Sequence, residues 1–263
     1  MDERPRLTSL HNPLVKRIRT LKGSKGRAEN ALFMVEGLHH VGSALEAGWE
    51  VEALLYAPDL LTDGYGTTLL ENASHNGLIP QPVSPKVMKS LAEKENPQGI
   101  LAAVRQRNFG FDDLGEIHTG VALVSPQDPG NVGTILRTID AVGADALFLL
   151  NGGVDLYHPT SVRASMGTIF WKPVVRASFD EFLSWEKGKK FRLVGTSAHA
   201  QMDYREVSLD NSPWVLLLGS EQKGLSDEQI AICDVTVSMP MRGKVSSLNL
   251  SVAAGILLYV INA

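Results

Sequence analysis

Three polar loop segments in the C-terminal half of the 263-residue chain each follow directly after an apolar run. They span residues 125–137, 218–225 and 239–249. Between them they supply amide, guanidinium, carboxylate and hydroxyl groups, which are side-chain types that bind and orient a polar substrate. The candidate side chains are Asn131, Arg137, Glu221, Ser247 and Asn249. If the apolar runs are parallel strands, the loops meet at the carboxyl ends of a sheet, where open α/β folds usually bind ligands.

Ordinary capping and turn formation is the alternative explanation for each loop taken alone. Asn131 and Ser247 are residue types that often cap helices, and Gly130 and Gly243 suit turns. Three such loops in one half of the chain favour a shared site over three unrelated turns.

Familiar catalytic signatures are missing, and their absence narrows the chemistry. The chain has no G-x-G-x-x-G, H-E-x-x-H or G-x-S-x-G pattern, and its seven histidines are scattered. Gly219 and Gly224 have the spacing of P-loop glycines, but Leu225 and Ser226 follow where a Lys-Ser/Thr pair is needed. A dinucleotide enzyme, a nucleoside triphosphatase and a zinc hydrolase are therefore disfavoured, and we expect no metal site.

The apolar runs of this half alternate with helical patterns. Strands are predicted over 121–124, 146–150, 192–195, 214–218 and 235–237, and helices near 134–142, 162–168, 227–232 and 247–261. Continuous apolar strands of this kind are typical of a parallel sheet covered on both faces. We expect an α/β domain over residues 118–263.

The N-terminal half predicts a smaller α/β domain over residues 1–108, joined by a linker at 109–117. Its strands are expected at 32–35, 51–56, 78–83 and 100–104, and its helices at 41–47, 67–73 and 86–92. Asn12 and Pro13 read as the cap and first residue of a further, N-terminal helix, with Leu14, Ile18 and Leu21 on one apolar stripe.

Charge is segregated along the chain. The net charge is −4, yet residues 4–27 contain eight Lys and Arg and no acidic residue, whereas residues 113–263 hold 12 basic and 16 acidic side chains. A solvated surface helix is one reading; the absence of a compensating acid favours contact with nucleic acid phosphates. The candidate nucleic-acid-binding residues are Lys16, Arg17, Arg19, Lys22, Lys25 and Arg27.

The chain also carries signals about its compartment. No apolar run is long enough to span a membrane, no signal peptide follows Met1, and Cys233 is the single cysteine. We expect a cytoplasmic protein without a membrane partner.

The three loop segments, in order and spacing, resemble motifs one to three of the SpoU branch of the SPOUT class of RNA methyltransferases. The resemblance covers residues 121 to about 260, and Ser247-Leu248-Asn249 after Met239-Pro240-Met241 is its most specific part. The N-terminal half is similar to the substrate-binding domain of ribosomal RNA ribose methyltransferases of this branch. That similarity rests on Ser9-x-x-Asn12-Pro13-x-Val15-Lys16, Lys25-x-Arg27, Phe33-x-Val35-Glu36-Gly37 and Glu95-Asn96-Pro97-Gln98-Gly99-Ile100.

The resemblance implies a homodimer that transfers a methyl group from S-adenosylmethionine to a ribose 2′-hydroxyl of RNA, with 23S ribosomal RNA preferred. It also implies a deep trefoil knot in the C-terminal domain. By motif position, Asn131, Arg137, Glu221, Ser247 and Asn249 belong to catalysis, and cofactor contacts fall on Thr196, Gly219, Met239 and Leu248. A tRNA 2′-O-methyltransferase and a non-catalytic RNA-binding module on the same fold are the alternatives. A small-molecule α/β enzyme is disfavoured by the basic N-terminal segment.

Methyl transfer from a sulfonium is an in-line displacement that depends on alignment and needs no metal. The hydroxyl must lose its proton, and the residue that the family offers for this step is Arg137. A guanidinium is ordinarily a poor base. Two versions stay open: Arg137 is desolvated and deprotonated at a dimer interface, or it stays charged and orients the adjacent phosphate while another group accepts the proton.

Overall fold

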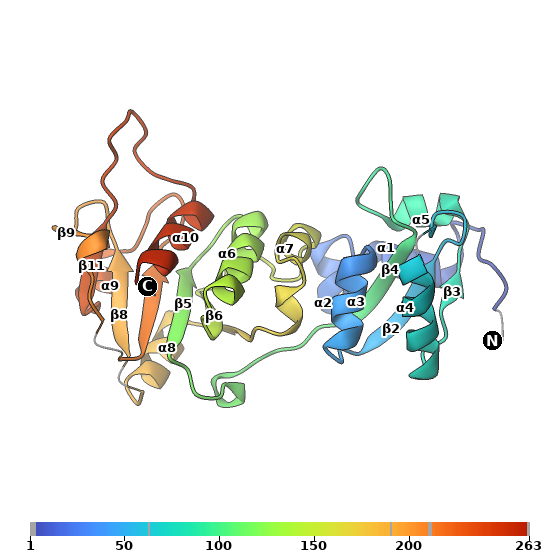
Figure 1. The fold of residues 1–263 in the computed structure, drawn as a ribbon, viewed down its shortest axis with the longest axis horizontal. Coiled ribbons are helices and arrows are strands. Elements are labelled where there is room, and N and C mark those ends of the chain that lie inside the picture. Colours follow the sequence, from blue (N-terminus) through green and yellow to red (C-terminus); the bar gives the residue numbers. More distant parts are fainter. Residues whose placement is uncertain (1–3, 63, 190, 210–211, 262–263) are drawn as a thin grey trace. The chain divides into compact units, whose positions relative to one another are not determined.

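A computed structural model describes residues 4–62, 64–189, 191–209 and 212–261 of the chain (Figure 1). The chain forms two compact units. Unit 1 comprises Met1–Arg107 and Tyr157–Trp171, and unit 2 comprises Asn108–Leu156 and Lys172–Ala263. Among the residues that the structure describes, no helix combines the length and the apolar character needed to cross a membrane.

Unit 1 is built on a mixed four-stranded sheet with the strand order β1-β4-β2-β3. Its strands are β1 (Leu32–Glu36), β2 (Val51–Tyr56), β3 (Gln81–Pro82) and β4 (Ile100–Arg105). β4 pairs antiparallel with both β1 and β2, and β2 pairs parallel with β3. All four predicted strands are present, although β3 is shorter than the expected 78–83.

Side-chain caps start three of the helices that the structure describes in unit 1. The helices of the unit are α1 (Pro13–Thr20), α2 (Ser24–Asn30), α3 (Leu38–Glu46), α4 (Gly64–His75), α5 (Pro85–Leu91) and α7 (Pro159–Ala164). The side chain of Asn12 accepts a hydrogen bond from the Leu14 amide at 2.9 Å, which confirms the predicted start of α1. The apolar stripe of this segment is buried at Val15, Ile18 and Leu21, while Leu14 is only partly buried.

Residues 157–171 pack within unit 1 although they lie far along the chain from the rest of it. The ring of Phe33 on β1 contacts the rings of Tyr157 and Phe170, with centroids 4.5 and 6.3 Å apart. The indole of Trp49 donates a hydrogen bond of 2.8 Å to the Phe170 carbonyl. Aromatic packing and a buried hydrogen bond therefore hold this segment in unit 1. Neither contact can be inferred from the sequence, because its two partners lie far apart along the chain.

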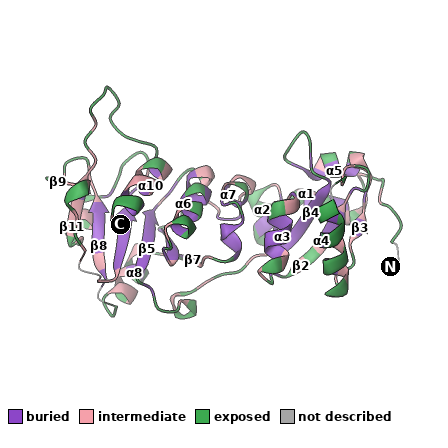
Figure 2. Cartoon of the chain, in the orientation of Figure 1, coloured by how far each residue is buried: buried purple, intermediate pink, exposed green. Residues whose placement is uncertain are grey.

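Unit 2 contains, in its described part, a seven-stranded parallel sheet with the order β7-β6-β5-β10-β8-β11-β9. Its strands are β5 (Thr119–Val124), β6 (Ala146–Leu150), β7 (Val174–Ala177), β8 (Arg192–Thr196), β9 (Met202–Asp203), β10 (Trp214–Leu218) and β11 (Val235–Ser238). Its helices are α6 (Pro129–Ala141), α8 (Phe179–Glu186), α9 (Asp227–Ala231) and α10 (Leu250–Ile261). The central strands are buried, as Figure 2 shows in purple, which confirms the predicted parallel α/β sheet.

Two parts of unit 2 differ from the sequence-based expectation. β7 and α8 lie outside the predicted elements, and Phe179, Phe182 and Trp185 bring apolar rings to α8 that pack together in the fold. The predicted linker at 109–117 packs into this unit. Phe111 stacks on Trp185 with ring centroids 5.0 Å apart, and the partly buried Phe109, Phe111 and Leu114 pack against the hydrophobic core.

Candidate active site

The loops that follow β5, β8, β10 and β11 emerge at one edge of the sheet in unit 2. These four strands are consecutive neighbours in the order β5-β10-β8-β11, and all run parallel. These loops carry the candidate residues or lead into the helices that carry them. Parallel pairing brings them to the same edge because each strand ends there.

The first and second loops are joined through Glu221. Its Oε1 accepts hydrogen bonds from the Asn131 side-chain amide at 3.0 Å and from the Asp128 amide at 3.3 Å. Its Oε2 accepts one from the Gln127 amide at 3.1 Å. Both carboxylate oxygens are therefore engaged, and Glu221 fixes the loop after β10 to the start of α6.

Asp128, not Asn131, caps α6. The Asp128 carboxylate accepts hydrogen bonds from the amides of Gly130 at 2.6 Å and Asn131 at 3.3 Å, with Pro129 in the first helical position. The Asn131 side chain is left to pair with Glu221, and Asn131 is only 7% exposed. Capping by Asn131 is thus excluded, and Asp128 and Gln127 are partners that the sequence analysis missed.

A cleft of about 930 Å³ lies beside these loops, within the size range of small-molecule sites. It is lined by all four residues expected to contact the cofactor, and by Glu221 and Ser247. The four are Thr196 at the end of β8, Gly219 after β10, and Met239 and Leu248 in the loop before α10. Residues 197–201, which follow β8, and Lys223 also line the cleft; the position directly after a strand could have marked them.

Gly219 is required by the loop's own backbone. A Cβ atom at this position would lie 2.0 Å from the Gly224 carbonyl carbon and 2.3 Å from the Leu225 nitrogen. The loop closes because the Gly224 amide donates a hydrogen bond of 2.9 Å to the Ser220 carbonyl, with Gly224 in the left-handed region at φ 66°. Any side chain at 219 would push this wall of the cleft apart.

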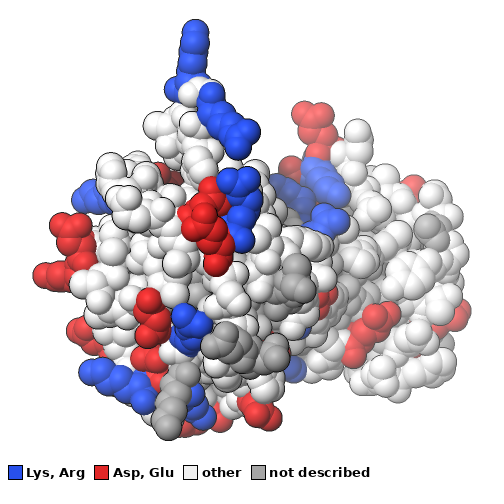
Figure 3. Space-filling model, turned by 60° about the vertical axis from the view of Figure 1, so that its left-hand side comes forward, with Lys and Arg blue, Asp and Glu red and all other residues white. Residues whose placement is uncertain are grey.

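The third loop projects from unit 2 between β11 and α10 (Figure 1), with Lys and Arg side chains at its tip (Figure 3). Asn249 caps α10: its Oδ1 accepts hydrogen bonds from the amides of Ser251 at 2.9 Å and Val252 at 3.4 Å. The helix therefore begins at Leu250 rather than at 247 as predicted. Ser247 stays in the exposed loop and faces the cleft, whereas Asn249 does not line it.

Arg137 stands apart from the cleft. It lies on α6, its side chain is exposed, and within the described residues its guanidinium has no hydrogen bond or ion pair. α6 packs against α10, where a Cβ at Gly255 would lie 4.0 Å from the Thr138 methyl group. The structure thus groups Asn131, Glu221 and Ser247 with the predicted cofactor residues, but not Arg137 or Asn249.

The basic residues of unit 1 are largely engaged inside the unit. Arg27 is 2% exposed, and its Nη1 donates hydrogen bonds to the carbonyls of Leu21 at 2.9 Å and Lys22 at 2.8 Å. It supports the end of α1 and cannot face RNA, so its predicted RNA contact is corrected. Arg19 donates to the Ser90 hydroxyl at 3.1 Å.

Acidic side chains from outside residues 4–27 supply the charges that the segment lacks. Arg17 pairs with Glu52 at 2.5 Å, Lys22 with Glu93 at 3.7 Å and Lys25 with Glu29 at 3.8 Å. Lys16 is exposed, and the Lys25 side chain is 88% exposed. Of the six predicted RNA-binding residues, Lys16, Arg17 and Lys25 are exposed.

Comparison with known proteins places this architecture in a family. Residues 118–259 match the SpoU rRNA Methylase family, and residues 12–102 match the MRM3-like substrate binding domain. The first match covers more than half of the chain, which therefore belongs to the SpoU rRNA methylase family. The fold is accordingly that of SPOUT methyltransferases, and the expected trefoil knot follows from that fold.

Relatives of known name match along nearly the whole chain. The 23S rRNA (uridine(2479)-2′-O)-methyltransferase of Streptomyces viridochromogenes is 34% identical over 97% of this chain and 90% of that protein. The 23S rRNA (guanosine(2553)-2′-O)-methyltransferase RlmP of Bacillus subtilis is 28% identical over 96% and 97%. The crystal structure of an AdoMet-bound rRNA methyltransferase from Sinorhizobium meliloti is 35% identical, covers 97% of this chain and 96% of that chain, and gives a TM-score of 0.88.

Proposed function

We propose that this chain transfers a methyl group from S-adenosylmethionine to a ribose 2′-hydroxyl of 23S ribosomal RNA. The observation that carries the proposal is the cleft of about 930 Å³, which collects residues from the segments after β8, β10 and β11 at one sheet edge. Two relatives matched over 96–97% of the chain are named as 23S rRNA 2′-O-methyltransferases, which favours ribosomal RNA over tRNA.

The lining of the cleft suits this cofactor. Leu218, Val237, Met239 and Leu248 provide apolar surface, and Thr196 provides a hydroxyl beside the main chain of the loops. An adenosine and a thioether chain need such a mixture of apolar walls and a few polar groups. Thr196, Gly219, Met239 and Leu248 would hold S-adenosylmethionine, which supplies a methyl group activated by its sulfonium.

The remaining candidate residues would position the RNA and the loops. Glu221 holds the first and second loops together, because its Oε1 accepts hydrogen bonds from the Asn131 side chain and the Asp128 amide, and its Oε2 accepts one from the Gln127 amide. The Ser247 hydroxyl lies at the cleft and would bind the target nucleotide, while Asn249 fixes the start of α10. Arg137 would stay charged and orient the phosphate beside the target ribose, since its exposed guanidinium has no partner within the described chain.

The outer face of α10 supports a homodimer. Val252 and Tyr259 are 49% and 60% exposed and lie with Ile256 on one stripe of a helix that carries no charged residue. A helix that is apolar on all sides is normally buried, so a second copy of the chain would cover this stripe. Tyr259→Asp should give a folded monomer by light scattering, whereas the wild type should be a dimer.

We also propose a cytoplasmic location, because the proposed substrate is ribosomal RNA.

The activity is tested by incorporation of labelled methyl groups from S-adenosylmethionine into 23S rRNA transcripts, followed by mapping of the modified ribose. The wild type should label one position, and Arg137→Ala should lose at least about 100-fold in rate while still binding S-adenosylhomocysteine. Lys187→Ala, an exposed cation in the same unit, serves as the control. Equal labelling by Arg137→Ala would remove this residue from the mechanism, and no labelling by the wild type would refute the activity.

A further inference from the structure

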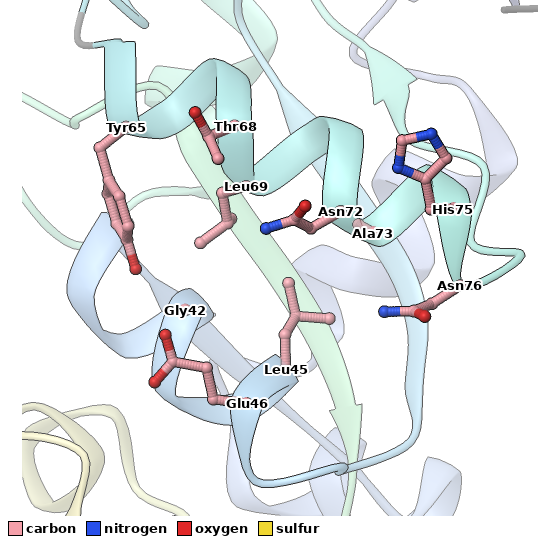
Figure 4. Close-up of a pocket in the computed structure, with 10 residues that line it drawn as sticks. All are labelled: Gly42, Leu45, Glu46, Tyr65, Thr68, Leu69, Asn72, Ala73, His75 and Asn76. Carbon is pink, nitrogen blue, oxygen red and sulfur yellow. The ribbon is translucent and has the colours of Figure 1, made fainter.

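A second, polar groove of about 310 Å³ lies within unit 1, between α3 and α4 (Figure 4). Apolar side chains of Leu45 and Leu69 are among those that line it. Its polar groups come from Glu46, Tyr65, Thr68, Asn72, His75 and Asn76. The volume is at the lower end of the range for small-molecule sites, roughly 300 to 1000 Å³, and so suits one small planar group.

The groove depends on a glycine. A Cβ atom at Gly42 of α3 would lie 2.5 Å from the Tyr65 hydroxyl and 3.1 Å from a Leu69 methyl carbon. A side chain at position 42 would therefore displace Tyr65 and occupy the space between the helices. As it stands, Tyr65 is 47% exposed, and its ring forms one end of the groove (Figure 4).

Four of the polar side chains around the groove are available to a ligand. Within the described residues, the side chains of Glu46, Asn72, His75 and Asn76 make no hydrogen bond or ion pair. In Figure 4 the Asn72 amide lies between the rings of Tyr65 and His75. An aromatic face thus lies near a side chain that offers both a donor and an acceptor.

The composition of the groove selects among RNA groups. Among the described residues no Lys or Arg lines it, and the Glu46 carboxylate in the lining would repel a phosphate. Amide side chains read the edges of bases, and Tyr and His rings stack on their faces, which is how unpaired RNA is recognised in sequence. We infer that this groove binds one unpaired nucleobase of the RNA substrate, stacked on Tyr65 and hydrogen-bonded by Asn72. The inference rests on the proposed function, and concerns which part of the RNA unit 1 reads.

The test compares two faces of the same helix. Tyr65→Ala and Asn72→Ala alter the groove, whereas Thr67→Ala and Glu71→Gln alter residues of α4 that do not line it. Stacking on, or hydrogen bonding to, one base typically changes affinity by about 10-fold or more, so KM for the rRNA should rise about tenfold in each groove variant. The kcat at saturating RNA and the affinity for S-adenosylhomocysteine should stay unchanged, as should all constants of the two controls.

A direct readout separates base recognition from a structural effect. Base-edge probing with dimethyl sulfate and carbodiimide should show a single unpaired nucleotide protected by the wild type and by Glu71→Gln, but exposed in the complex with Asn72→Ala. Wild-type KM in both groove variants, or identical protection patterns, would overturn the inference while leaving the methyl transfer intact. No methyl transfer by the wild type would instead refute the proposed function, and the inference with it.

Discussion

Two surfaces of unit 1 differ in a way that the sequence conceals. The α1–α2 segment contains a dense set of cations, yet Arg27 is buried, and Arg17 and Lys22 pair with acidic side chains far along the chain. The groove between α3 and α4 has no cation in its lining, yet its amide, imidazole and carboxylate groups are unengaged within the described residues.

The difference teaches that the number of charges in a segment does not measure how many are available to a partner. A cation that donates hydrogen bonds to carbonyl groups or pairs with a distant carboxylate is less available to bind another molecule. These contacts form only when the chain folds. The accessible lysines of α1–α2 would contact phosphates whatever the sequence of the RNA, whereas the α3–α4 groove would recognise one base. The two surfaces should therefore respond differently to mutation, salt and pH.

The largest expected effect separates structural from accessible cations within α1–α2. Arg27→Met removes two hydrogen bonds to the end of α1 and leaves the Leu21 and Lys22 carbonyls without them. The free energy of unfolding should fall by about 2 to 4 kcal/mol, as is typical when a buried hydrogen-bonded group is removed. Urea unfolding measures this loss. Lys25→Met should change stability by less than about 0.5 kcal/mol, as is usual for a surface substitution, and an equal loss in both variants would contradict the distinction.

A second prediction concerns the accessible lysines. The double variant Lys16→Glu/Lys25→Glu should bind rRNA at least about tenfold more weakly at low salt, because attraction to phosphates becomes repulsion. The slope of log affinity against log salt should become shallower, by about 0.7 to 0.9 for each phosphate that the variant no longer neutralises. Filter binding over a salt series measures both quantities. Lys187→Glu/Lys189→Glu makes the same charge change in unit 2, and an identical response there would show a net-charge effect only.

The groove should behave in the opposite way in the same salt series. Asn72→Ala should lower affinity by about tenfold at every salt concentration, since binding a base releases no counterions. Its salt slope should run parallel to that of the wild type. A slope that shifts with this variant would mean that the groove holds a phosphate, and the comparison of the two surfaces would fail.

The smallest effect concerns the buried side of α3. Burial lowers the pKa of His40 below its usual value of 6.5, against an opposing hydrogen bond with the Arg163 carbonyl. The unfolded chain therefore takes up this proton more readily, and stability present above about pH 6.5 should decline as the pH falls below it. Unfolding midpoints between about pH 7.5 and 5 should show a flatter dependence in His40→Gln. An equally steep dependence in His40→Gln would contradict the assignment to this side chain.

Much of the fold was predictable because local chemistry and periodicity agree. Asn12 with Pro13 starts α1 as expected, and continuous apolar runs predicted five of the seven strands in the described part of unit 2. The sequence did not predict β7, β9 or α8. Of these, α8 is stabilised by ring packing such as that of Trp185 with Phe148, residues that meet only in the folded core. The same packing makes the expected linker part of unit 2.

The sequence by itself determined which residue types follow the parallel strands, and hence the edge at which a cleft had to form. Its motifs also named Thr196, Gly219, Met239 and Leu248, which the structure brings to one cleft. Only the tertiary structure decided the partners: Glu221 with Asn131, Arg27 with the end of α1, and residues 157–171 with unit 1. The physical reason is that propensity and periodicity act over a few residues, whereas hydrogen bonds and burial join groups up to about 120 positions apart.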